Sequence, residues 1–257
     1  MTHRLGRSMY DMDPLRAAFD AWYAAILERL KAAGLDAAFD DEPDGETDDA
    51  AERLLWQTCG YPLTHDLRGT VQLVATPVYR AEGCEGTDYR SAIVVREEER
   101  GRDLRALGGR IAAVNAMDSQ SGMNALRHAA APHTRDGEFF EQVLLTGTHA
   151  ASAAAVRDGA ADVAAIDCVT WALLRAHDSY TVDGLRVLGW TEPAPGLPWV
   201  APLGTDAERL ATLREALAAP APPELLIERF EVLAADAYDV ILAQEQQAID
   251  QGYPELQ

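Results

Sequence analysis

Short apolar runs alternate with longer amphipathic stretches along most of the chain, a pattern typical of β-strands followed by α-helices. The clearest strands of the first half are predicted at 70–77 and 89–95, where β-branched residues are frequent. The clearest helix is predicted from Pro14 to Ala33, because apolar side chains recur on one face and Gly34 follows as a stop. The pattern therefore predicts an α/β protein.

The same alternation predicts the remaining elements. Further strands are expected at 5–10, 35–39, 54–59, 110–114, 139–146, 162–166 and 185–190. A brief further helix is expected to begin at Asp48 and Asp49. Other helices are expected at 123–130, at 151–160 where Gly159 closes the helix, from Asp167 onward, at 206–219 and at 223–249. The proline-rich segment 191–204 is interpreted as a connection that crosses between lobes. Alternation of this kind predicts a mixed, mostly parallel sheet flanked by helices.

Length and composition fit two modest lobes. With 257 residues, of which 48% are hydrophobic, the chain can bury a sizeable core. We expect residues 1–95 together with 196–257 to form the first lobe and residues 96–195 the second. In folds of this kind the strand-to-helix turns of two lobes face a ligand in the cleft between them.

The charge of the chain excludes two classes of partner. A formal net charge of −20 would repel the phosphate backbone of nucleic acid and the surface of an acidic membrane. A small anionic ligand would have to be bound by local dipoles and neutral hydrogen-bond donors, against the field of the whole protein.

The N-terminal residues MTHRLGRSMYDMDPLRAAF contain no apolar stretch after their basic residues. No window of the chain approaches the roughly eighteen apolar residues that cross a bilayer, so no membrane insertion is expected. As written, the chain is expected in the cytoplasm, and in the periplasm if a leader has been removed.

The cysteines and acidic residues do not form a recognisable metal or cofactor site. Cys59, Cys84 and Cys168 lack zinc-ligand spacing and are interpreted as reduced thiols, with Cys168 in the core. Cys59 and Cys84 could still form a disulfide in an exported protein. The acidic run at 40–49 lacks the spacing of a calcium loop and is interpreted as solvated. We therefore expect no metal and no cofactor.

The stretch from Gly108 to Ala130 carries the strongest candidate site. A strand at 110–114 leads through a polar turn containing Ser119 and Ser121 into a helix. The hydroxyl groups, the first-turn amides and the positive end of the helix dipole could together bind an anion. Gly122 would let a ligand approach the backbone. The alternative is that one serine only caps the helix.

Two other strand-to-helix turns have similar chemistry. Gly147, Thr148 and His149 lead into one helix, and residues 166–169 lead into the next. His149 could face an anion or only solvent. Asp167 could meet a ligand amine or cap its helix, and the two readings are equally supported.

These motifs together resemble the phosphate, phosphite and phosphonate-binding proteins of ABC transporters. The resemblance rests on DSQSG before a helix, GTHAASAAAVRDGAADVAAID after it, WQTCGYP and YRSAIVV upstream, and LPWVAPL downstream. It implies a type II periplasmic-binding-protein fold that closes around an oxyanion. By this resemblance Ser119, Gln120 and Ser121 match the anion turn, His149 matches a second-lobe histidine, and Tyr89 matches the aromatic residue that begins a hinge strand.

Aromatic residues near predicted strand ends supply further candidates. Tyr10 and Trp56 are favoured as ligand-contacting residues, although aromatic side chains at such positions more often belong to the core. The loop at 40–49 has no aromatic residue, where family members often carry a tyrosine. This difference leaves the expected ligand at the level of a small oxyanion.

The sequence therefore predicts a non-catalytic solute-binding protein that closes over a small oxyanion, phosphate-like or phosphonate-like. It would serve as the substrate-binding component of an ABC transporter, with the permease as its partner, or as a ligand sensor. The alternative is a cytoplasmic enzyme on the same scaffold, in which His149 works with Cys59 or Asp167.

Overall fold

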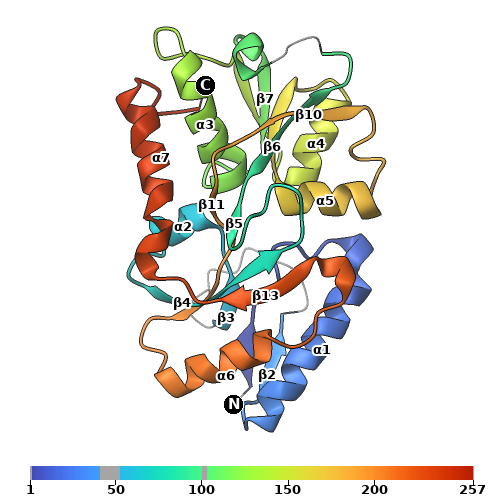
Figure 1. The fold of residues 1–257 in the computed structure, drawn as a ribbon, viewed down its shortest axis with the longest axis vertical. Helices are drawn as coiled ribbons and strands as arrows, with labels where there is room; N and C mark the ends of the chain where they lie inside the picture. The colour runs from blue at the N-terminus through green and yellow to red at the C-terminus, as the bar shows by residue number, and fades with distance from the viewer. Residues whose placement is uncertain (1, 41–52, 100–102, 257) are drawn as a thin grey trace. The chain divides into compact units, whose positions relative to one another are not determined.

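The structure is a computed structural model that describes residues 2–40, 53–99 and 103–256 (Figure 1). The chain forms two compact units, Met1–Arg80 with Pro195–Ala237, and Ala81–Ala194 with Tyr238–Gln257. It passes from one unit to the other three times along its length. Each unit contains its own sheet and helices, which confirms the predicted α/β class.

The first unit is built on a six-stranded sheet of order β13-β4-β12-β3-β1-β2. Its strands are β1 (His3–Leu5), β2 (Ala37–Phe39), β3 (Arg53–Gln57), β4 (Val71–Tyr79), β12 (Trp199–Pro202) and β13 (Ile227–Glu231). Its helices are η1 (Asp13–Leu15), α1 (Arg16–Ala32), α2 (Gly60–Thr64), α6 (Ala207–Leu217) and η6 (Pro223–Leu225). The 3₁₀ helix η7 (Ala235–Tyr238) lies at the junction of the units in the chain.

Helix α1 supplies much of the first unit's core. Its predicted apolar face is buried, and the Trp22 ring packs edge-on against Trp199 at 6.0 Å and stacks on Phe230 at 6.1 Å between ring centroids. The indole of Trp22 also donates a 3.3 Å hydrogen bond to the carbonyl of Ala219. The helix predicted from Pro14 to Ala33 is thus confirmed.

The second unit is built on a five-stranded sheet of order β10-β6-β9-β7-β8. Its strands are β5 (Asp88–Tyr89), β6 (Ser91–Arg96), β7 (Ile111–Val114), β8 (Gln142–Leu145), β9 (Val163–Asp167) and β10 (Leu185–Trp190), with β11 (Ala194–Pro195) at the unit boundary. Its helices are η3 (Leu104–Leu107), the π-helix η4 (Gln120–Asn124), α3 (Ala125–Ala130), η5 (Ala131–His133), α4 (His149–Arg157), α5 (Cys168–His177) and α7 (Asp239–Asp250).

Both sheets are mixed, as expected, but parallel pairing does not dominate either of them. In the first unit β1 is parallel to β2 and β3, whereas β12 and β13 pair antiparallel with their neighbours. In the second unit β7 is parallel to β8 and β9, whereas β6 is antiparallel to β9 and β10. The antiparallel pairs come from strands that return after long connections, which local alternation does not reveal.

The C-terminal segment differs most from its prediction. The single helix expected at 223–249 is wrong, because η6 ends at Leu225, the next residue Leu226 is left-handed (φ 58°), and β13 follows. The segment 191–204, expected as a connection alone, contains strand β12. The brief helix expected at Asp48 and Asp49 lies outside the described residues.

The boundaries of the two units also differ from the expected ones. Helix α7 belongs to the second unit, beside α3 (Figure 1), because Gln244 and Glu245 bond side chains of the η4–α3 segment. Residues 81–95 belong there too, because β6 pairs with β9 and β10 in the middle of the sheet.

Candidate functional site

Ser119 begins the helix that carries the predicted anion turn. Its Oγ accepts a 3.0 Å hydrogen bond from the Gly122 amide, and its carbonyl accepts from the amides of Met123 and Asn124. The predicted capping role of Ser119 is therefore confirmed. A serine hydroxyl has one hydrogen to donate in addition to its acceptor lone pairs, so capping leaves Ser119 able to donate a hydrogen bond.

Ser121 joins the anion turn to the histidine turn. Its Oγ lies 2.8 Å from Nε2 of His149, the first residue of α4. The Ser121 carbonyl accepts a 2.9 Å hydrogen bond from the hydroxyl of Ser91 in β6. Helix α4 is capped by Thr148, whose Oγ1 accepts from the Ala151 amide. The structure thus brings together two predicted turns that lie 28 residues apart in the sequence.

His149 is neutral at physiological pH. Burial lowers its pKa to about 4, and the backbone of Ala165 offsets only part of that effect. A neutral imidazole donates from one ring nitrogen and accepts at the other. With the hydrogen on Nε2, Ser121 Oγ accepts from the ring, and the hydroxyl hydrogen of Ser121 can turn toward a ligand. A neutral histidine can therefore prepare Ser121 as a donor.

The low pKa of His149 predicts a specific loss of stability in acid. Between pH 6.5 and about 4 the unfolded state binds a proton that the folded state does not, so stability falls as pH falls through this window. The full effect is roughly 3 kcal/mol of unfolding free energy. Urea unfolding of wild type and His149→Gln from pH 7 to pH 4 measures it, because carboxylate titrations are common to both proteins. If the unfolding free energies of the two proteins changed with pH in parallel, the low pKa of His149 would be contradicted.

Gly122 and Asn115 are packed directly against each other at this turn. A Cβ atom on Gly122 would lie 1.8 Å from Oδ1 of Asn115 and 3.3 Å from Cε1 of His149. That Oδ1 atom is buried and makes no hydrogen bond with the described residues. Asn115 directly follows β7 and is a site residue that the sequence did not single out. Its only signal was its place after a buried strand.

Gln120 is held by the protein rather than turned outward. Its Nε2 donates to Gln244 Oε1 at 2.8 Å, and its Oε1 accepts from Asn124 Nδ2 at 2.7 Å. Gln244 in turn donates to the carbonyl of Pro193 at 3.0 Å. These hydrogen bonds connect the anion turn to α7. A direct contact between Gln120 and a ligand stays a prediction.

Residues 52–241 match a family described as ABC transporter, phosphonate, periplasmic substrate-binding protein. The chain belongs to this family. Among curated proteins, no match to the chain is found.

Three solved structures show a similar fold. PhnD1 from Prochlorococcus marinus, in complex with methylphosphonate, is 15% identical with a TM-score of 0.72, covering 97% of this chain and 98% of that one. A binding protein component of an ABC phosphonate transporter from Pseudomonas aeruginosa is 15% identical with a TM-score of 0.75, covering 97% and 87%. XAC2383 from Xanthomonas citri, bound to chloride, is 16% identical with a TM-score of 0.69, covering 97% and 98%. The likeness places this chain in the type II periplasmic-binding-protein fold, as the sequence predicts.

Two further predicted residues of this phosphonate-binding family member have structural roles in the second unit. Asp167 Oδ1 accepts from the amides of Val169 and Thr170 at 2.7 and 3.0 Å, which confirms the capping alternative. Asp167 in β9 pairs with Ser91 in β6, and the Ser91 hydroxyl binds the Ser121 carbonyl. Ser91 therefore connects the cap of α5 to the anion turn. Tyr89 is buried in β5, two residues before Ser91. Ligand contacts for Asp167 and Tyr89 stay predictions.

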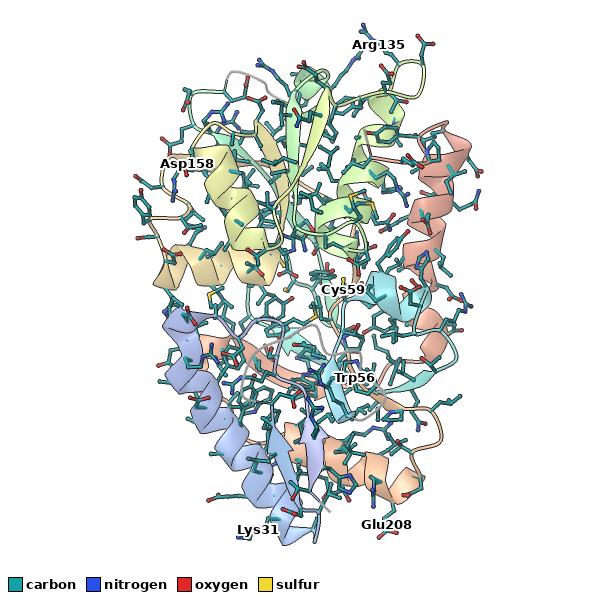
Figure 2. The ribbon with its side chains drawn as sticks, turned by 180° about the vertical axis from the view of Figure 1, so that it is seen from behind. Lys31, Trp56, Cys59, Arg135, Asp158 and Glu208 are labelled. Carbon is teal, nitrogen blue, oxygen red and sulfur yellow. The ribbon has the colours of Figure 1, made fainter. Side chains whose placement is uncertain are left out.

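The predicted aromatic residues Tyr10 and Trp56 belong to the first unit. Tyr10 is 4% exposed and packs edge-on against Tyr79 at 5.1 Å, and Trp56 is 7% exposed in β3 (Figure 2). Ser8 and Met9, just before Tyr10, bond one side-chain oxygen of Gln57 at 2.8 and 3.0 Å. Both aromatic side chains are packed as core residues, and their contact with a ligand stays a prediction.

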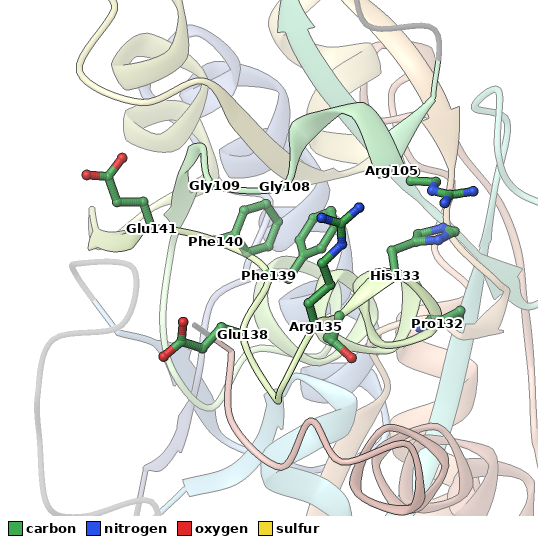
Figure 3. A pocket seen from close by; sticks show the side chains of 11 residues that line it. Arg105, Gly108, Gly109, Pro132, His133, Arg135, Glu138, Phe139, Phe140 and Glu141 are labelled. Atoms are coloured by element: carbon green, nitrogen blue, oxygen red, sulfur yellow. The ribbon is translucent and has the colours of Figure 1, made fainter.

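A cavity of about 770 Å³ lies elsewhere in the second unit (Figure 3). Figure 3 shows Arg105 and His133 near each other, with Glu138 and Glu141 on the opposite side. The cavity is lined by Arg105, Gly108, Gly109, Pro132, His133, Thr134, Arg135, Glu138, Phe139, Phe140 and Glu141. No predicted site residue is among them, and the mixture of charges does not favour an anion.

In the described part of the chain, no group of three or more His, Cys, Asp or Glu side chains is arranged to hold a metal ion. None of the helices described combines the length and the apolar character that crossing a bilayer requires.

Proposed function

We propose that this chain is a non-catalytic substrate-binding protein whose ligand, a small phosphonate-like or phosphate-like oxyanion, contacts Ser119 and Ser121. The observation that carries the proposal is the 2.8 Å pairing of Ser121 Oγ with His149 Nε2 at the start of a capped helix. With the hydrogen of His149 on Nε2, both serine hydroxyl groups remain able to donate at the positive end of the helix, where an anion is stabilised.

Neutral donors suit this protein better than a cluster of cations. The net charge of −20 disfavours long-range attraction of an anion, so affinity has to come from short-range contacts. Hydrogen bonds from fixed hydroxyl groups and amides to a charged ligand are stronger than those to a neutral one. His149 contributes by orienting Ser121 while it remains uncharged.

The ligand class is supported by the family and by what its structural relatives bind. The family is described by phosphonate, and PhnD1 of Prochlorococcus marinus holds methylphosphonate. XAC2383 of Xanthomonas citri binds chloride in one structure and ATP in another. The shared property of these ligands is negative charge, so the proposal specifies an anion and leaves the group attached to it to the binding test.

Thermal unfolding with a panel of anions tests this function. Phosphate, phosphite, methylphosphonate, sulfate and ethanesulfonate are added in turn, and a bound anion raises Tm with concentration. Ser121→Ala should weaken the best anion about 10- to 100-fold, as expected for losing a hydrogen bond to a charged group. Ser179→Ala is the matched control, because Ser179 is an exposed serine of the same unit. The site assignment fails if both variants bind alike.

The partner that we propose is the membrane component of an ABC transporter, with a periplasmic location as in the family description. A ligand sensor would bind the same anion and differ only in its partner. Uptake of the identified anion by cells with and without this protein separates the two. For the non-catalytic role, phosphorus NMR of methylphosphonate incubated with the protein should show unchanged ligand, whereas turnover lost in His149→Ala would favour an enzyme.

A further inference from the structure

Cys84 and Cys168 are neighbours in the second unit. Their Sγ atoms lie 3.4 Å apart, and both side chains are free thiols. The sequence suggested Cys59 as the partner of Cys84, but the structure places Cys84 against a cysteine 84 residues later in the chain. Cys168 is fully buried, whereas Cys84 is partly exposed to solvent.

The backbone holds the two thiols in this position. Gly83 has a φ of +97°, and a Cβ atom there would lie 2.9 Å from Cβ of Cys168 and 2.7 Å from the Trp190 ring. Only glycine allows the turn to approach α5 so closely. The Cys84 amide bonds the Ala81 carbonyl at 3.1 Å, and the Cys168 amide bonds the Arg90 carbonyl at 3.1 Å. Both cysteines are therefore positioned by main-chain contacts.

We propose that Cys84 and Cys168 form a reversible disulfide in the native protein. The two sulfur atoms need to approach by roughly 1.4 Å to reach the bonded distance of about 2.05 Å. A rotation about the side-chain bonds of Cys84, which lies in a surface turn, can supply such a movement. The hydrogen bond with Cys84 and the burial of Cys168 both raise the pKa of the Cys168 thiol. Cys84 is the more exposed of the two thiols, so its sulfur meets the oxidant first.

The oxidant is a disulfide, either a small molecule such as oxidised glutathione or another protein. The Cys84 thiol loses its proton, and its sulfur attacks one sulfur of the oxidant, which expels the first thiolate. The Cys168 thiol then loses its proton and attacks Cys84 Sγ, which expels the second thiolate. The two thiolates take up the two protons. The protein loses two protons and two electrons, and one oxidant disulfide becomes two thiols.

The Cys84–Cys168 disulfide would close a covalent loop that contains residues of the candidate anion site. The segment between Cys84 and Cys168 contains both Ser121 and His149. Cys168 directly follows Asp167, which pairs with Ser91, and the Ser91 hydroxyl binds the Ser121 carbonyl. Oxidation therefore restrains the strand to which the anion turn is bonded, whether or not the proposed ligand is correct.

Thiol counting on the full-length protein tests the disulfide. The protein is reduced, freed of reductant and incubated with oxidised glutathione, then denatured under alkylation and digested. We expect three alkylated cysteines before oxidation and one, Cys59, after it, with a linked peptide pair that contains Cys84 and Cys168. In Cys59→Ser the count should fall from two to none.

Two variants identify the order of attack. Cys168→Ala should accumulate a glutathione adduct on Cys84, because the resolving thiol is absent, and Cys84→Ala should leave Cys168 free. The proposal is overturned if wild-type protein keeps all three thiols, or if wild-type Cys84 stops at the glutathione adduct. Peptide mapping of wild-type protein decides the question even if a variant fails to fold.

Discussion

Gly122→Ala should remove the anion-induced rise in Tm and destabilise the protein. The added Cβ would meet Asn115 Oδ1 at 1.8 Å and Asn115 Cγ at 3.0 Å. The closest real Cβ contacts are far longer, so either Asn115 or the helix start has to move. His149 Cε1, at 3.3 Å from the same position, limits movement on the other side. Overpacking of a filled site costs about 1–3 kcal/mol, and the movement displaces Ser121 from its partner.

Gly108→Ala is the matched control for this prediction. Gly108 lies in the same unit, but a Cβ atom there would make only ordinary contacts, the nearest at 3.7 Å from the Phe139 ring. We expect Gly108→Ala to keep both Tm and the response to the anion found with wild type. Asn115→Gly combined with Gly122→Ala opens space at the contact and should recover part of the lost stability. Full anion response in Gly122→Ala alone would show that the turn is not the site.

The candidate site could be predicted from the sequence where its chemistry is local. Ser119 caps the helix that follows it, and His149 begins the helix after Thr148, as the strand-turn-helix pattern indicated. Helix capping depends on a few consecutive residues, so one stretch of sequence contains the information. The pairing of Ser121 with His149 was expected only in general terms, because two turns of one sheet had to meet at the same edge.

The contacts that the sequence did not reveal join residues far apart in the chain. Gln120 was interpreted as part of an anion turn, but its amide is bound by Gln244, which lies 124 residues later. Asn115 was overlooked because the close approach of its side chain to Gly122 depends on the fold and not on local spacing. Polar groups in such places look alike in sequence whether a ligand or another side chain binds them.

The C-terminal boundary was mispredicted for a related reason. Residues 223–249 have enough helical character to suggest one helix, and a strand with a partly exposed pattern at Ile227–Glu231 gives no alternation to reveal it. The chain leaves the first unit after this strand, and α7 then packs within the second unit. Side chains of the η4–α3 segment that bind α7 account for this placement, and Arg127 is one of them.

Arg127→Ala should destabilise the second unit by at most about 3–5 kcal/mol, the usual effect of removing one member of a buried ion pair, because the Arg127 side chain is 5% exposed but that of Glu245 is 19% exposed. Arg127 is 4% exposed, and its guanidinium bonds Asn124 Oδ1 at 2.7 Å and Glu245 Oε1 at 2.9 Å. It also donates to the Pro254 carbonyl at 2.7 Å. The substitution leaves the Glu245 carboxylate without this cation and removes a link from α3 to both α7 and the C-terminal residues.

Urea unfolding, followed by far-UV circular dichroism, measures the effect of Arg127→Ala. Arg135→Ala is the control, because Arg135 is an exposed arginine at the end of the same unit (Figure 2) and its loss should change stability by less than about 0.5 kcal/mol. Arg127→Lys keeps the charge but not the forked geometry of the guanidinium. Its loss of unfolding free energy should therefore fall between those of Arg127→Ala and Arg135→Ala. Equal midpoints for Arg127→Ala and Arg135→Ala would mean that α7 does not stabilise the unit that carries the anion turn.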